Sequence, residues 1–501
     1  MRKSRKKQST TSLFPLKVEE LKKQIEEKFE NNTDLNITIY EHQNKNLIVF
    51  YISYQVAKEK VENVLLKPLL ESKKEWDTSS ILNEIPLSAG ETVDKKENIL
   101  KNLINGSVIV YVENENAAVS YVMLNVEKRG LEKAETESVV IGPQVAFTES
   151  LETNLNIIRW RIRSTDLVLE KFLIGERTPR EVRLLYLKSL ANETDVSTMR
   201  QRLQDLVVDE IEDGNVLMQY IEDSSSTIFP QYYATELPDR ASYAITKGRL
   251  SVLVENSPTA IIAPTTFISF FESTEDLYMR WNAGSFLRIL RFFSIFISVL
   301  LTPMYVAAVT FHYEIIPLEL LTSIGESRAK VPFPPIFEAL LLELLIELLR
   351  EAGARLPTKV GQTIGIVGGV VVGTAAVQAG ITSDILIIFV TISALASFTV
   401  PSYLMGTTIR VLRFPMIILA GTLGIIGIMF GICFLFIHLL KLTSLGRPYL
   451  SPVYPFQSED FNKTFFRFPS TFQGKRFVSY RPKDLMRFNN KTAKEKNDID
   501  E

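Results

Sequence analysis

The acidic residues of the segment 336–351 have a spacing that could act on ions. Glu343, Glu347 and Glu351 follow one another at intervals of four, which places three carboxylates on one face of a helix. Carboxylates that line a channel favour cations, so these three residues are candidates for an acidic vestibule. The alternative is an ordinary amphipathic helix that rests on a membrane surface.

The segment 361–380 carries a second pattern, with small residues on one helical face and mixed polar and apolar residues on the other. The candidate packing face consists of Gly361, Gly365, Gly369 and Gly373. The opposite face, a candidate pore lining, holds Thr363, Val367, Val370, Thr374 and Gln378. Valines can gate a pore by dewetting, while hydroxyl and amide groups support hydrated ions. The same polar groups could instead hydrogen-bond to neighbouring helices.

No catalytic or metal-binding pattern stands out in the sequence. His42, His312 and His438 are too scattered for ligand spacing, and the single cysteine, Cys433, lies in an apolar run. Phosphate loops, nucleophile elbows and zinc motifs do not occur in the context that they require. We therefore predict a protein that is not an enzyme and that uses no cofactor and no metal.

Charge and hydropathy divide the 501-residue chain into two parts. Charged residues recur up to about residue 285, whereas long apolar runs dominate from 286 to 440. Because a bilayer core needs about 20 apolar residues per helix, this division predicts a soluble region followed by a multi-pass α-helical membrane domain. The predicted spans are 290–311, 361–380, 385–404 and 416–440, with an acidic amphipathic helix at 336–351. The formal net charge of −2 gives no reason to expect a nucleic-acid partner.

Basic residues at the ends of the apolar runs bear on topology. Five of the first seven residues are basic, which suits an anionic cytoplasmic leaflet or a solvated tail, and the stretch that follows lacks the apolar core of a secretory signal. Arg288 and Arg291, with ten Lys or Arg after Phe456, place both ends in the cytoplasm, which four crossings satisfy. Arg410 and Arg413 would then lie outside. A fifth crossing by the acidic helix would return them inside and export the C-terminal tail.

The soluble region contains two similar stretches. Residues 106–122 read GSVIVYVENENAAVSYV and residues 248–264 read GRLSVLVENSPTAIIAP. Each has a glycine, alternating β-branched residues, a Val-Glu-Asn turn and a second apolar run, which is typical of a β-hairpin. Apolar strands and amphipathic stretches that begin near Ala57 and Asp195 accompany them. We predict two related α/β modules, although antiparallel hairpins with polar turns resemble one another by default.

These patterns divide the chain into five parts. They are a basic N-terminal tail and lead-in (1–33), the first α/β module (34–145), the second α/β module with its connection to the membrane (146–285), the membrane domain (286–440) and a polar basic C-terminal tail (441–501). A helix is predicted over 151–172, between the two sheets. Glu222 and Asp223 are predicted to lie in a turn.

Several long stretches of the sequence indicate the family to which the chain is related. They are LPDRASYAITKGRLSVLVEN (237–256), RILRFF (288–293), IIPLELLTSIGESRAKVPFPP (315–335) and LTSLGRPYLSPVYPF (442–456). From about Glu170 to Phe456, the sequence closely resembles the A subunit of GerA-type germinant receptors of endospore-forming bacteria. Residues 1–130 and the segment after Phe456 do not share in this match.

The resemblance implies a role in nutrient-triggered spore germination, in the inner membrane of the dormant spore. It implies a permease-like B subunit and a lipoprotein C subunit as partners, with membrane lipids around the helices. It also implies a homo-oligomeric ring, a pentamer in this family, that forms a nutrient-gated ion channel and releases cations. Nutrient binding in the family is assigned to the B subunit, so no ligand residue is predicted here. A solute transporter and a non-conducting signalling scaffold remain alternatives.

Overall fold

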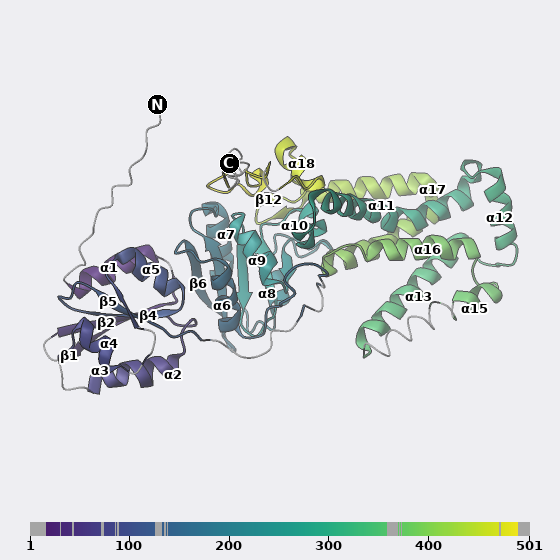
Figure 1. Ribbon diagram of the computed structural model, residues 1–501. Helices are drawn as coiled ribbons and strands as arrows, with labels where there is room; N and C mark the ends of the chain where they lie inside the picture. The colour runs from purple at the N-terminus through teal and green to yellow at the C-terminus, as the bar shows by residue number, and fades with distance from the viewer. Residues whose placement is uncertain are drawn as a thin grey trace, which may run out of the picture.

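The chain forms two sheet modules followed by a set of long helices, and its C-terminal segment returns to the modules (Figure 1). The computed structural model describes residues 17–488 except 31, 43–44, 72–74, 86, 88–89, 126–132, 135–136, 138, 358–368, 370, 372 and 470–471.

The first module is a five-stranded antiparallel sheet of order β1-β2-β4-β5-β3. Its strands are β1 (Leu35–His42), β2 (Lys45–Ile52), β3 (Gly90–Val93), β4 (Ser107–Val112) and β5 (Ala118–Val122). One face packs on α1 (Val18–Lys28) and α5 (Lys96–Ile104). The other face packs on η1 (Val61–Leu66), α3 (Lys67–Glu71) and α4 (Thr78–Glu84), and the short helix α2 (Lys58–Lys60) precedes η1. Ile48 and Phe50 face one layer while Leu47 and Val49 face the other, as strand alternation requires.

The second module repeats this topology, with the order β6-β7-β9-β10-β8. Its strands are β6 (Leu167–Ile174), β7 (Arg180–Leu187), β8 (Tyr233–Thr235), β9 (Leu250–Val254) and β10 (Ala260–Ala263). Helices α6 (Leu151–Arg161) and α9 (Pro238–Thr246) cover one face, and α7 (Glu193–Gln204) and α8 (Gly214–Ile221) cover the other. The predicted pair of related α/β modules is therefore confirmed in its two sheets.

The two predicted hairpins have the same turn. Asn114 and Asn256, the last residues of the Val-Glu-Asn sequences, have φ angles of 67° and 59°, a left-handed conformation that asparagine tolerates. The predicted helix over 151–172 is wrong in its second half, because α6 ends at Arg161 and strand β6 begins at Leu167. The apolar run at the start of β6 is buried on both faces of the sheet, with Leu167 and Leu169 on one face and Val168 on the other, and such a run has no periodicity that separates strand from helix.

The remaining helices form the second part of the molecule. They are α10 (Glu275–Tyr278), α11 (Trp281–Phe311), α12 (Leu318–Arg328), α13 (Pro335–Arg355), α15 (Gly373–Gln378), α16 (Asp384–Ser397) and α17 (Tyr403–Lys441). Among the described helices, α11 and α17 are long and apolar enough to cross a membrane. Phe286 and Phe293 of α11 and Phe430 and Phe434 of α17 are each more than 60% exposed. An apolar surface of this kind needs a covering medium or partner.

Helix α17 is two antiparallel limbs rather than one rod. Gly424 has φ 64° and ψ −144°, a conformation that is essentially restricted to glycine, and the chain reverses there. A Cβ at Gly431 would collide with Met416, fifteen residues earlier, although a straight helix would separate the two by about 22 Å. Both ends of α17 therefore lie at the module side, while Gly424 lies beside His312 at the far end of α11.

Two predicted spans need correction and a third is mostly untested. The span 416–440 is interrupted by the reversal at Gly424. The span 385–404 is not one helix, because α16 ends at Ser397 and Ser402 caps the start of α17 just after Pro401. The segment 361–380 lies largely outside the described residues. Helices α11 and α13 contain the predicted segments 290–311 and 336–351.

The C-terminal segment packs against the modules. It contains β11 (Thr443–Ser444), β12 (Arg447–Pro448), α18 (Ser458–Phe465) and η6 (Val478–Tyr480). Arg447 forms an ion pair with Asp195 of α7 (Nη2–Oδ1, 2.7 Å), and Lys483 pairs with Glu193. The predicted polar tail is thus, up to residue 488, a docked part of the fold.

Candidate functional site: buried charge networks between helices and modules

A buried ion pair lies at the centre of the helical part. The Arg413 guanidinium of α17 donates to the Glu343 carboxylate of α13 over 2.5 Å (Nη1–Oε2), and each side chain is 1% exposed. Arg413 also donates to the Ser298 hydroxyl of α11 at 3.0 Å and to the Ser393 carbonyl of α16 at 3.3 Å. Thr302 donates to the second oxygen of Glu343. One charge pair therefore links four helices.

The other acidic candidates are also paired. Glu347 accepts a hydrogen bond from Arg350 (3.1 Å) and lies 3.5 Å from Arg410, whereas Glu351 pairs with Arg355 at the surface. Near the start of α13, Glu338 forms a buried ion pair with Arg328 of α12 (2.8 Å). Within the single chain, the predicted acidic stripe is therefore neutralised by arginines. Helical spacing could show the partners within α13, Arg350 and Arg355, but not Arg410 and Arg413, which come from α17.

The candidate pore helix is described only in its second half. Gly361, Thr363, Gly365, Val367 and Val370 lie outside the described residues. Thr374 and Gln378 of α15 are exposed, and a Cβ at Gly369 or Gly373 would meet no described atom within 4 Å. Neither of these glycines is thus packed against a described part of its own chain.

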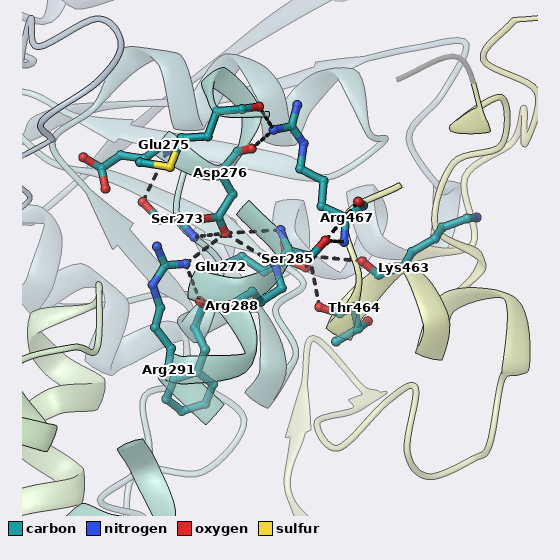
Figure 2. A network of polar contacts seen from close by, with 12 residues as sticks. Glu272, Ser273, Glu275, Asp276, Ser285, Arg288, Arg291, Lys463, Thr464 and Arg467 are labelled. Atoms are coloured by element: carbon teal, nitrogen blue, oxygen red, sulfur yellow. Dashed lines mark hydrogen bonds and ion pairs between the residues drawn. The ribbon is translucent and has the colours of Figure 1, made fainter. Parts of the chain in front are cut away.

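A second network joins the sheet region to the first long helix (Figure 2). Asp276 of α10 is fully buried, and its carboxylate accepts from Arg291 at 2.9 Å and from Arg288 at 3.4 Å. Both arginines lie in the first three turns of α11. Arg288 also lies 3.5 Å from the Glu272 carboxylate. The start of α11 is therefore held by charge to the segment that follows the second sheet.

The C-terminal segment closes the same network. Arg467 donates to the backbone carbonyl groups of Asp276 and Met279, and to that of Leu277 at 2.7 Å. Arg288 in turn donates to the carbonyl groups of Lys463 and Thr464, both at 3.0 Å. Figure 2 shows these side chains converging from three segments of the chain. Any movement of α11 relative to the second module must disturb both ends of this network.

A third attachment holds the end of α17 on the second module. Asp223 accepts hydrogen bonds from the Thr443 hydroxyl (2.5 Å) and from the Gly446 backbone N–H (2.8 Å). Burial acts to raise the pKa of Asp223, but these hydrogen bonds and the Arg202 guanidinium together hold it below its usual range. His438 contacts Thr227, and Thr408 in the other limb donates to the Ile228 carbonyl. The predicted turn at Asp223 thus also docks the helical part.

Sequence reasoning missed these networks, although a signal was present. Arg288, Arg291 and Arg413 entered the sequence analysis only as indicators of topology. Charged residues next to or within long apolar segments are costly unless they are paired, so each of them predicts a partner. The partners Asp276 and Glu343 lie 12 to 70 residues away, and only the tertiary structure identifies them.

The fold defines a protein with a duplicated α/β sheet region followed by long apolar helices. Comparison with known proteins identifies its family. More specifically, the chain belongs to the Bacillus/Clostridium GerA spore germination protein family, whose model matches residues 23–478. This confirms the resemblance found in the sequence and corrects its extent, because the match also covers residues 23–130 and 457–478.

Individual relatives share most of their length with the chain. It is 40% identical over 418 residues to spore germination protein GerQA of Bacillus cereus, covering 83% of each chain. It is 36% identical to spore germination protein KA of Bacillus subtilis (strain 168), covering 90% of this chain and 84% of the relative. The uncharacterized membrane protein YfkQ of Bacillus subtilis (strain 168) is 33% identical, with 84% and 83% covered.

A solved structure is also similar to this chain. It is the N-terminal domain of the A subunit of the Bacillus megaterium spore germinant receptor GerK3. The two are 26% identical with a TM-score of 0.40, covering 52% of this chain and 98% of that one.

Proposed function

We propose that this chain is a membrane subunit of a germinant receptor that triggers spore germination, and that several copies form a nutrient-gated channel that releases cations. Family membership supports the role in germination, since relatives that cover more than 80% of the chain are spore germination proteins. A permease-like B subunit and a lipoprotein C subunit are the proposed partners. The proposed location is the inner membrane of the spore.

Exposed aromatic side chains support a multi-pass membrane domain. Phe293 and Phe434 belong to helices that carry their apolar surface outward, which suits contact with lipid. The 31 residues of α11 extend about 46 Å, enough to cross a bilayer core with some tilt. Because α17 reverses at Gly424, its two ends return to the modules, and Arg410 lies near the start of its first limb, close to the Thr408 contact with the second module. A cytoplasmic location of the modules then agrees with Arg288, Arg291 and Arg410, while Arg413 is paired with Glu343 in the interior.

The observation that carries the channel proposal is the open space around Gly369 and Gly373, the two glycines of the predicted packing face that the structure describes. Glycines at every fourth position allow close helix packing in a membrane, yet a Cβ at Gly369 or Gly373 would meet no described atom within 4 Å. A neighbouring copy in a closed ring would supply the missing contact. The opposite face, with Thr363, Val367, Val370, Thr374 and Gln378, would then line the pore.

The ion pairs of α13 favour a second candidate function, a non-conducting scaffold. Glu343 and Glu347 are paired with arginines, so neither presents an uncompensated charge to a passing cation. The buried networks at Asp276 and Asp223 would suit a part that transmits movement from the modules to another subunit. In that case the glycine face would pack against the permease-like partner.

Native mass spectrometry of the detergent-solubilised chain is the first test. The channel proposal expects a ring of four or more copies. Gly369→Leu should disrupt it by forcing the helices apart, whereas Gly325→Leu, at an equally open glycine of α12, should not. A stable monomer or dimer of the native chain would exclude a pore made by this chain alone.

Planar bilayer recordings then separate the candidate functions. The channel proposal expects single-channel currents, with Val370→Ala widening the constriction and raising leak. Saturable solute uptake without unitary currents would instead support a transporter. A ring that conducts no ions, as the native chain or as the Val370→Ala variant, would support the scaffold.

A further inference from the structure

A strongly basic pocket lies beside the junction network but is not explained by it. It lies between α9, the start of α11 and the C-terminal segment, and its cavity is small, about 30 Å³. Its charged lining consists of Lys247, Arg288, Lys463, Arg467, Lys475 and Glu272. Outside the lining, Arg288 also pairs with Asp276, Lys475 pairs with Glu459 at 2.9 Å, and Lys463 lies 3.8 Å from Asp460. Lys247 has no such carboxylate partner among the described residues, and a buried ammonium group of this kind is costly unless an anion compensates it.

Lys247 and Lys463 are the lining cations with hydrogen-bonding capacity left for an anion, since Lys475 is paired with Glu459. The Arg288 and Arg467 guanidinium groups already donate to carbonyl groups of the junction. Lys247 is only 5% exposed, and its ammonium group has no hydrogen-bond or carboxylate partner among the described residues. Lys463 has only a 3.8 Å contact with Asp460 and two 3.5 Å contacts with backbone carbonyl groups.

Aromatic rings shape the pocket around these two lysines. The Lys247 ammonium lies 4.9 Å from the ring centre of Tyr243 and 5.8 Å from that of Phe477. Lys463 lies 5.7 Å from the same Phe477 ring. The ring holds both ammonium groups in one pocket, and apolar walls strengthen the attraction for an anion by excluding water.

The pKa of Lys247 reflects its burial and its positively charged neighbours. Burial, together with the charges of Arg487, Lys463 and Arg476, lowers the pKa of Lys247 to about 7, while Glu272 acts in the opposite direction. An anion in the pocket would favour the protonated form and reverse this effect. The charged form of Lys247 and a bound anion therefore stabilise each other.

We propose that this pocket binds a phosphate group, held by the Lys247 and Lys463 ammonium groups. Two sources of that group fit the position. A free phosphate could enter from the aqueous side. Alternatively, a phospholipid headgroup could reach it, because Phe466 and Phe468 line the pocket and are 49% and 40% exposed, as aromatic residues at a membrane interface often are. The proposal does not depend on channel formation, since none of its residues lies in the candidate pore helix.

Binding to the purified full-length chain tests the proposal with two probes. Equilibrium dialysis with radiolabelled inorganic phosphate at pH 6.5 measures the first source. Nanodiscs of phosphatidylcholine with or without phosphatidylglycerol, followed by native mass spectrometry of retained lipid, measure the second. Lys247→Gln and Lys463→Gln should each weaken binding at least tenfold. Lys58→Gln removes an exposed lysine of the first module and should leave binding unchanged.

Each outcome is decisive. Saturable phosphate binding with one site per chain supports a free-phosphate site, and selective retention of phosphatidylglycerol supports a headgroup site. The absence of both overturns the proposal, as does binding that Lys58→Gln weakens as much as Lys247→Gln. Lys247→Gln removes a buried charge, so the variant is expected to fold. A thermal unfolding midpoint at least as high as that of the native chain verifies this. Native mass spectrometry of the Gly369→Leu variant tests the proposed ring. The ring and the phosphate site can therefore fail independently of each other.

Discussion

Arg413 and Glu343 lie 2.5 Å apart in the interior of the helical part, although 70 residues separate them in the sequence. The pair joins α17 to α13 and, through hydrogen bonds, to α11 and α16. A buried pair of this kind does not guarantee net stability relative to apolar residues, but removal of one partner leaves the other as an uncompensated buried charge.

Glu343→Gln should therefore lower the stability of the helical part by about 3–5 kcal/mol. Thermal unfolding of the purified chain in detergent measures the loss. Glu351→Gln breaks the exposed pair with Arg355 and should change stability by less than about 1 kcal/mol. Addition of Arg413→Met to Glu343→Gln should recover part of the loss. A double variant that is less stable than Glu343→Gln alone would contradict the uncompensated-charge explanation.

Asp276→Asn should loosen the junction between the second module and α11. The substitution removes the negative charge that compensates Arg288 and Arg291, at a cost of about 3–5 kcal/mol. Hydrogen exchange should then accelerate in the first turns of α11 and in residues 458–488, while the first module keeps its protection. Glu152→Gln, which breaks an exposed pair with Lys58, is the matched control. Uniform acceleration across both modules would indicate general unfolding instead.

Gly424→Ala should open the reversal in α17. Alanine strongly disfavours the backbone conformation of Gly424, and its Cβ would lie 2.8 Å from His312 Nε2. Spin labels can be attached at Tyr403→Cys and Lys441→Cys, with Cys433 replaced by serine. Electron–electron double resonance then measures the distance between the two ends of α17. A straight helix would place these positions about 57 Å apart, so the native chain should give a much shorter distance. In the Gly424→Ala variant, the distance distribution should broaden toward longer values.

Lys247→Met should stabilise the chain in anion-free buffer, by an amount that depends on pH. With the pKa of Lys247 near 7 in the folded state and 10.5 as its ordinary value, the unfolded chain binds more protons between these two values. The stability of the native chain therefore rises with pH over this window, and the cost of the buried charge is largest below pH 7. The advantage of the methionine variant, on the order of 1–4 kcal/mol at pH 6.5, should shrink toward pH 10. Melting curves at pH 6.5, 8 and 9.5 measure it, and a constant advantage would contradict the prediction.

Local sequence patterns predicted the elements whose conformation depends mainly on neighbouring residues. The Val-Glu-Asn hairpins were predicted because Asn114 and Asn256 tolerate the left-handed conformation that the turn requires. Helix α13 was predicted from its periodicity, and α11 from its uninterrupted apolar run. The strand β6 was missed because a short apolar run buried on both faces does not distinguish strand from helix.

By itself, the sequence determined the two-part organisation, the repeated α/β modules and the family. Hydropathy, strand alternation and the order of long characteristic sequence blocks are all properties of the linear chain. Only the tertiary structure decided that α17 turns back at Gly424, that Glu343 is compensated by Arg413, and that the C-terminal segment closes the junction at Asp276. The physical reason is that the free energy of a buried charge depends on which partner the fold brings within hydrogen-bond distance, and helical periodicity carries no information about a partner on another element.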